Sequence, residues 1–249
     1  MIEPLNMFLF GLIIGSFCNV VVYRLPRGKS IILPGSQCRA CGKAISIKDN
    51  LPLISYFILG AHCRFCKEHI SFRYPAVEFI VGLLFVLIWL KFGLGITFVV
   101  YAILASTLLV VALIDYDHKI IPNIITLPGM IIGLGLSTWA LPITPTDSLA
   151  ALLLGGGLFY LIAFFFKGGM GAGDIKLIAM IGSFLGWQGT LFTIFFGALL
   201  GSLVGMTLML LGRKGRKDKV PFGPFLSCGA ILFILSGKDL IDWYLNLLP

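Results

Sequence analysis

Charged residues are scarce in this sequence. Of its 249 residues only 12% are Asp, Glu, Lys or Arg, whereas 58% are hydrophobic and the mean hydropathy is +1.01. This scarcity excludes an ordinary soluble domain, in which roughly a quarter of the residues are charged. The composition is typical of a multi-pass membrane protein with a small soluble insert, in which lipid replaces water around the helices.

Other absences each exclude a further class of structure. The first apolar segment, 5–24, has no basic region before it and no small-residue cleavage site, which excludes a cleaved signal peptide. The sequence has no strand–GxGxxG–helix unit, so a dinucleotide-type cofactor fold is not expected. It also has no internal repeat and no low-complexity stretch.

Long apolar runs predict about eight transmembrane helices, because a helix needs about 20 apolar residues to cross a bilayer. The runs lie at 5–24, 75–91, 96–115, 120–140, 148–166, 174–187, 189–211 and 222–237. A tight turn is expected at 186–189, and the tail 239–249 is too short to span, so we expect it at the membrane interface. The predicted fold is an all-α polytopic bundle with a small cytoplasmic zinc-ribbon-like cysteine insert.

Lysine and arginine predict the orientation of these helices. Residues 24–73 carry nine of the nineteen, the loop 213–219 carries five, and Lys119, Lys167 and Lys176 lie near two aspartates. With eight spans and both termini outside, seventeen of the nineteen fall on the cytoplasmic side, as the positive-inside rule requires. The net charge of +8 is therefore mostly an orientation signal, and no nucleic-acid partner is expected.

Composition divides the chain into 1–74, the first helix plus a polar, cysteine-bearing insert, and 75–249, a helical bundle with short loops. Many glycines lie inside the apolar runs, including Gly197, Gly201 and Gly205 at four-residue spacing. Small residues allow membrane helices to approach closely, so these glycines predict helix packing.

Two CxxC pairs predict a metal site in the insert. Cys38 and Cys41 form the first pair, Cys63 and Cys66 form the second, and 21 residues separate the two pairs. Two such turns complete a tetrahedral four-sulfur site, which is typical of structural zinc because no coordination position is open. A pair of disulfides is the competing interpretation, and a reducing cytoplasm disfavours it.

Two aspartates lie at the ends of apolar segments, where a carboxylate is costly unless it has a function. Asp115 closes the run 104–114, and Asp174 follows Gly171-Ala172-Gly173 and opens another run. The charge pattern places both at the cytoplasmic face. If their helices are neighbours, one carboxyl can activate a water while the other, protonated, polarises a peptide carbonyl.

Alternatives to this interpretation remain open at the level of the residues. Asp117 is an alternative to Asp115 as the first functional aspartate. Each aspartate taken alone could also be a solvated residue at a helix end or a helix cap. A proton- or metal-coupled transporter also uses carboxylates in the membrane, usually nearer the midplane. A further alternative is a structural membrane subunit that docks a partner protein through its zinc ribbon.

Several motifs together resemble the bacterial type IV prepilin peptidases, the bifunctional leader peptidase/N-methyltransferase family, over essentially the whole chain. The resemblance rests on 11–20 (GLIIGSFCNV), on 23–26 (YRLP), on both CxxC pairs with Pro34, on Arg73-Tyr74-Pro75 with Glu78, on Asp115 with Ile121-Pro122-Asn123, and on 171–176 (GAGDIK). The spacing from Asp115 to the Ile-Pro-Asn element fits the family's first catalytic motif. The resemblance therefore favours Asp115 over Asp117.

The resemblance implies a GxGD-type aspartic endopeptidase in the bacterial inner membrane, with Asp115 and Asp174 as its catalytic residues. It implies cleavage of the basic leader from type IV prepilins and type II secretion pseudopilins at the cytoplasmic face. It also implies N-methylation of the new first residue by S-adenosylmethionine. For the methyl donor the resemblance offers only weak candidates near the cysteine insert and the first helix: Asn19, Arg24, Arg73 and Glu78.

Overall fold

The structure is a computed structural model, and it describes residues 2–166, 170–212 and 220–246. Within these ranges the secondary structure is helical apart from two isolated β-bridges. The chain forms two compact units, Met1–Leu94 and Gly95–Pro249. Composition placed the division at 74/75, whereas packing places it after Leu94, because the helix that begins at Arg73 lies along the first helix.

In the first unit, α1 (Ile2–Arg24) packs antiparallel against α3 (Arg73–Phe92). Glycines on α1 make this close approach possible. A Cβ on Gly11 would lie 2.7 Å from the Cα of Gly82, and a Cβ on Gly15 would lie 2.7 Å from the Cα of Glu78. The close crossing brings Glu78 against the inner face of α1.

The insert between α1 and α3 contains only short elements. They are the 3₁₀ turns η1 (Leu25–Arg27) and η2 (Ile47–Asp49) and the short helix α2 (Ile54–Ile58). The Arg24 guanidinium donates to the carbonyls of Ser30 (3.2 Å) and Gly35 (2.9 Å), so it ties the start of the insert to the end of α1. A bidentate ion pair between Arg64 and Asp49, at 2.6 and 2.8 Å, joins the second cysteine turn to η2.

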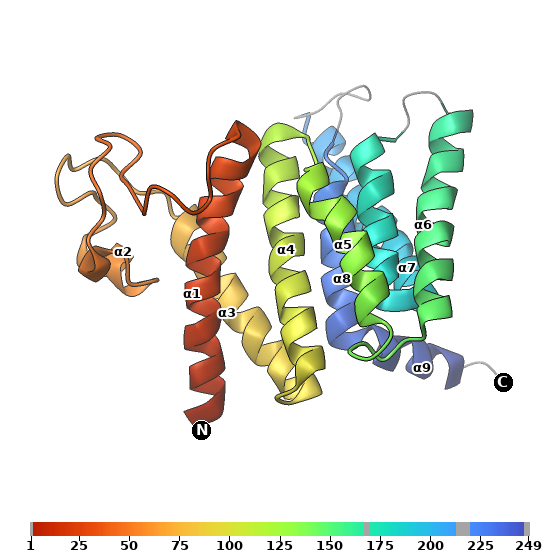
Figure 1. Ribbon diagram of the computed structural model, residues 1–249. Helices are drawn as coiled ribbons and strands as arrows, with labels where there is room; N and C mark the ends of the chain where they lie inside the picture. The colour runs from red at the N-terminus through yellow and green to blue at the C-terminus, as the bar shows by residue number, and fades with distance from the viewer. Residues whose placement is uncertain (1, 167–169, 213–219, 247–249) are drawn as a thin grey trace. The chain divides into compact units, whose positions relative to one another are not determined.

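The second unit is a bundle of helices (Figure 1). Its elements are α4 (Ile96–His118), α5 (Asn123–Leu136), α6 (Pro145–Phe165), α7 (Ala172–Leu210), α8 (Gly223–Leu232), the π-helical turn η3 (Phe233–Gly237) and α9 (Lys238–Asn246). The first half of α7 lies at the centre, with Leu177, Ile178 and Ile181 fully buried. Helix α8 packs against both α4 and α7.

Helix α7 folds back on itself at the predicted turn. Gly186 has φ 70° and ψ −176°, which interrupts the helix, and Thr190 beyond the break contacts Gly182 before it. Asp147 at the start of α6 caps the new helix, because its carboxylate accepts the N–H of Trp187 at 3.0 Å. A Cβ at position 186 would overlap that carboxylate, so both the backbone angle and the contact require glycine.

Among the described residues, six helices are long and apolar enough to cross a membrane, and α5 is a shorter apolar helix. Because α7 is divided at Gly186, the described residues contain eight apolar helical segments. An all-α membrane bundle with about eight helices is therefore confirmed. The basic loop 213–219 and Lys167, which contributed to the predicted orientation, lie outside the described residues.

The predicted helix packing through glycine is confirmed at most of the positions that suggested it. Gly197 and Gly201 approach α8 at Leu226 and Phe225, whereas a Cβ on Gly205 would meet nothing within 4 Å in this chain. The first half of α7 is similarly close to α5, because a Cβ on Gly133 would overlap Ser183.

Candidate functional site

Asp115 lies in the last turns of α4 and points into the bundle. Its side chain is buried, and its Oδ2 accepts the backbone N–H of Gly223 at 2.9 Å. Asp117 is exposed, because two residues along a helix turn a side chain to nearly the opposite face. It lies within α4, which continues to His118. Burial therefore distinguishes the two aspartates.

Asp174 is the third residue of α7 and is half-buried. Gly171 is the N-cap, and its N–H donates to the Asp174 carboxylate, while the Asp174 N–H donates to the Gly171 carbonyl at 3.1 Å. The Asp174 side chain thus supplies the N3-to-N-cap half of a capping box, and the positive end of the helix favours a carboxylate there. A Cβ on Gly173 would lie 2.9 Å from the Cβ of Ile121, so this glycine is needed for packing.

The structure brings the two predicted aspartates together. Asp115 and Asp174 are close enough to interact electrostatically. A second contact links their surrounding motifs, because Lys176 Nζ donates to Asn123 Oδ1 at 2.9 Å. Asn123 is the first residue of α5, so the start of α5 and the start of α7 are held side by side. Two carboxyls at adjoining helix ends can share one proton and act as acid and base on a single water.

Gly223 is a residue of this site that the sequence interpretation missed. It begins α8, and a Cβ there would lie 2.6 Å from Asp115 Oδ2. Only glycine can therefore bring its N–H to that carboxylate. The Phe222-Gly223-Pro224 element could have indicated the start of a helix, because a Gly-Pro pair often marks one. Nothing in the sequence linked this element to Asp115.

The four predicted cysteines converge on one point. Their sulfur atoms all lie within 4.8 Å of one another, and Cys38 Sγ is 3.7 Å from Cys66 Sγ. A tetrahedral zinc with Zn–S bonds of about 2.3 Å places its sulfurs about 3.8 Å apart, so the thiols fit this ion. Backbone N–H groups of Cys66 and Phe65 lower the pKa of Cys63 to about 6, which favours the thiolate that a metal requires.

The two cysteine turns are built alike. In each, the N–H of the first cysteine donates to the carbonyl five residues later, Cys38 to Lys43 and Cys63 to Glu68. A β-bridge flanks each turn at the same offsets, Gln37 with Ala44 and His62 with His69. The repetition of one turn geometry around one sulfur cluster confirms a zinc-ribbon-like insert. His62 and His69 are exposed and lie outside the cluster.

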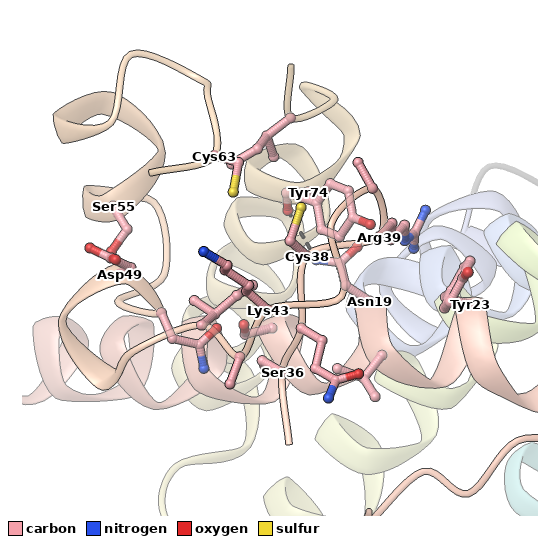
Figure 2. Close-up of a pocket in the computed structure, with 18 of the residues that line it drawn as sticks. Asn19, Tyr23, Ser36, Cys38, Arg39, Lys43, Asp49, Ser55, Cys63 and Tyr74 are labelled. Carbon is pink, nitrogen blue, oxygen red and sulfur yellow. Dashed lines mark hydrogen bonds between the residues drawn. The ribbon is translucent and has the colours of Figure 1, made fainter. Parts of the chain in front are cut away.

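The first unit also contains a cavity of about 740 Å³. Asn19, Arg24 and Glu78, three of the four weak candidates for the methyl donor, line it, and Arg73 does not. Figure 2 shows Asn19 and Tyr23 on one side and the loop carrying Ser36, Cys38, Arg39 and Lys43 beside them, with Asp49 and Ser55 beyond. The cavity thus lies between α1, the first cysteine turn and the segment around α2.

Comparisons with known proteins match both units. Residues 9–92 match the bacterial peptidase A24 N-terminal domain, and residues 102–206 match the type IV leader peptidase family. No solved structure matches the chain.

Several relatives that match most of this chain carry the same name. Proteins named prepilin leader peptidase/N-methyltransferase are 36% identical in Bacillus subtilis, over 97% of both chains, and 33% identical in Pseudomonas putida, over 96% of this chain and 92% of the relative. A third, from Myxococcus xanthus, is 38% identical over 86% of this chain and 65% of its own length. The chain therefore belongs to the type IV leader peptidase family.

Proposed function

We propose that this protein removes the leader peptide from type IV prepilins and pseudopilins and then methylates the new amino terminus. The observation that carries the first half is the juxtaposition of Asp115 and Asp174 at two helix ends of a membrane bundle. The names of the relatives support both halves and give no support to a transporter.

In the proposed cleavage, one aspartate accepts a proton from water while the water oxygen attacks the scissile carbonyl carbon. The other aspartate, protonated, donates a hydrogen bond to the carbonyl oxygen and stabilises the charge that develops there. When the C–N bond breaks, the departing amine takes a proton from the carboxyl that received it from water. The Gly223 N–H keeps Asp115 in one orientation throughout, so the pair is preorganised for the reaction.

The remaining assignments follow the same proposal. Cys38, Cys41, Cys63 and Cys66 hold one structural zinc, and S-adenosylmethionine supplies the methyl group. Methyl transfer belongs to the first unit and cleavage to the second. The protein lies in the bacterial inner membrane with the cysteine insert and both aspartates on the cytoplasmic side, where a basic leader joined to an apolar helix presents its scissile bond. The six membrane-spanning candidates support a multi-pass protein in lipid.

Cleavage by purified protein tests the peptidase assignment. A prepilin is incubated with each variant, and the product is weighed by mass spectrometry. Asp115→Asn and Asp174→Asn keep the size of the side chain, and Asn can still accept the Gly171 and Gly223 N–H groups, so folding should survive. We expect cleavage to fall at least 1,000-fold, roughly the loss seen when a reacting group is removed.

Asp117→Asn is the matched control and should cleave at the normal rate, because its side chain is exposed on the other face of α4. Full cleavage by Asp174→Asn would overturn the assignment, as would an equal loss in all three variants.

A further inference from the structure

One uncharged segment of the insert has no part in peptide cleavage or in the metal site. Residues 50–61 (NLPLISYFILGA) contain no charged side chain and include α2, although they lie in the polar, basic part of the chain. An apolar run of this length is too short to span a bilayer and is typical of a buried core helix or of an interfacial segment. The exposure of its side chains distinguishes these two possibilities.

Helix α2 presents one apolar face to its surroundings. Ile54, Phe57 and Ile58 stand at the i, i+3 and i+4 positions that share one helix face, and they are 53%, 71% and 74% exposed. Ser55 is buried instead, and its hydroxyl donates to the Lys48 carbonyl at 3.1 Å. The three exposed side chains do not line the cavity of this unit. A buried core helix is therefore excluded, and the described residues leave the apolar face of α2 uncovered.

The contacts between this segment and α3 set its depth in the membrane. Helix α3 has 20 residues and is about 30 Å long, the thickness of the hydrocarbon core, so Arg73 at its start lies at a membrane boundary. Glu78 lies five residues further along α3, about 7.5 Å below that boundary, and its Oε2 accepts the Leu53 N–H at 2.9 Å. The Tyr56 ring lies 6.3 Å from the ring of Phe72, just before α3. The segment therefore lies between the boundary and a depth of about 7.5 Å, and in Figure 1 α2 is level with the middle of α1 and not beyond its end.

The backbone of the segment is paired as a dry environment requires. The N–H groups of Leu51 and Leu53 donate to Ser55 Oγ at 3.0 Å and to Glu78 Oε2 at 2.9 Å, and those of residues 59–61 donate to carbonyls earlier in the segment. Irregular backbone near lipid is tolerated only where its polar groups have such partners, because lipid offers none. Water would supply these hydrogen bonds itself, so their internal pairing favours lipid over water around α2.

We propose that α2 is an interfacial segment that inserts Ile54, Phe57 and Ile58 into the membrane leaflet on the insert's side. The insert continues at both ends into membrane-spanning candidates, α1 and α3, so the lipid around those helices adjoins this face directly. Interfacial helices bury an apolar face about 5–10 Å into the headgroup and acyl boundary, which agrees with the depth that α3 sets. Lipid is favoured over a partner protein because it is already present at that depth. The inference depends on the membrane helices and not on the proposed reactions.

Photo-crosslinking tests what covers this face. The photoreactive residue p-benzoylphenylalanine, whose ketone bonds to nearby C–H groups on irradiation, takes the place of Phe57 or Ile58 in the full chain. Inner-membrane vesicles that contain each variant are irradiated, because both lipid and other membrane proteins are present there. The variants are then purified, checked for a monodisperse elution profile, and analysed for adducts by mass spectrometry. We expect phospholipid adducts at both positions.

Lys29 provides a matched position outside the membrane boundary. Asn19 Nδ2 on α1 donates to the Tyr74 carbonyl at 3.1 Å, so α1 passes the start of α3 at this residue. Arg24 lies five residues further along α1, about 7.5 Å outside the boundary, and its carbonyl accepts the Lys29 N–H at 3.1 Å. Lys29 is exposed, as Phe57 and Ile58 are. The photoreactive residue at position 29 should give at least fivefold less lipid adduct than at 57 or 58.

A charge on the same face tests whether its apolar character drives the insertion. With the photoreactive residue at position 58, Ile54→Asp should lower the yield of lipid adduct at least threefold, because a short carboxylate cannot reach back to the headgroups as a lysine can. Ile54→Leu is the matched control and should leave the yield unchanged. An equal yield from Ile54→Asp and Ile54→Leu would show that this face does not enter the leaflet.

Two results of the crosslinking would overturn the proposal. One is a lipid yield at positions 57 and 58 no higher than at position 29, which would place α2 in water. The other is a majority of adducts to another protein at 57 and 58, which would make the face a protein-docking surface. Because the two positions are substituted separately, one well-folded variant is enough to decide.

Discussion

At the scale of single residues, the candidate peptidase site depends on backbone groups as much as on side chains. Asp115 is held by the N–H of Gly223, and Asp174 by the N–H of Gly171. Both donors are glycines where a side chain would crowd the carboxylate, because a Cβ on Gly171 would lie 3.0 Å from Asp174 Oδ2. These two glycines therefore allow the backbone to approach each carboxylate closely, and neither has a positive φ.

Substituting Gly223 tests this dependence. In Gly223→Ala the new methyl group would overlap Asp115 Oδ2 and displace the carboxylate, so we expect prepilin cleavage to fall at least tenfold while methyl transfer to a mature pilin peptide continues. Gly205→Ala is the matched control, because a Cβ on that helical glycine would meet nothing within 4 Å. Cleavage by Gly223→Ala at the Gly205→Ala rate would contradict the proposed role of this hydrogen bond.

At the scale of elements, the cysteine insert is held together by its two turns and not by a core. Its ordered elements are short, and many of its apolar side chains are exposed, including Ile32, Ile47 and Ile58. An insert with so little burial needs a further source of stability, and a metal bound by four thiolates can supply it.

Metal content tests the zinc assignment. We expect one zinc per chain by elemental analysis of the purified protein. Cys38→Ser should lose it, because the three remaining thiolates no longer complete the tetrahedral site. Cys18→Ser, a change at a buried cysteine of α1, should keep its zinc. Well-folded wild-type protein without metal would refute the assignment.

The equivalence of the two turns gives a sharper test. Four residues after its first cysteine, each turn has a left-handed backbone, Gly42 at φ 69° and Lys67 at φ 59°. Glycine adopts this conformation without strain, whereas another residue loses about 1 kcal/mol. Lys67→Gly should therefore slow zinc loss to a chelator several-fold.

Gly42→Ala should accelerate zinc loss by a similar factor. The space around Gly42 is open, so only the backbone angle can cause this change. Faster zinc loss from Lys67→Gly would show that the two turns are not equivalent.

At the scale of the whole molecule, the distribution of cations predicts which side of the membrane the insert occupies. Trypsin should therefore cut the insert in inverted inner-membrane vesicles, where Lys29, Lys43 and Lys48 are exposed, and leave it intact in sealed spheroplasts. Fragments are identified by mass spectrometry, and spheroplasts opened with detergent serve as the control. Cutting in sealed spheroplasts would reverse the proposed orientation.

Much of the fold follows from local patterns that the sequence displays directly. Apolar runs define the helices because lipid requires every backbone group to be paired within its own segment. The CxxC spacing defines the metal cluster because each turn is local, and Gly186 marks the reversal within α7 because it lies between two such runs. The two aspartates were identifiable for a similar reason, since a carboxylate at a helix end in lipid is rare enough to stand out.

Contacts between distant segments were decided only by the tertiary structure. The sequence by itself determined which residues are helical, which cysteines form the cluster and which aspartates are candidates. It did not determine that Gly223 meets Asp115 across 108 positions, or that Glu78, Tyr74 and Arg39 surround one cavity. Which residues become neighbours depends on how the helices pack, and this packing depends on small differences in side-chain size along each helix. No local sequence pattern shows which helix faces will meet.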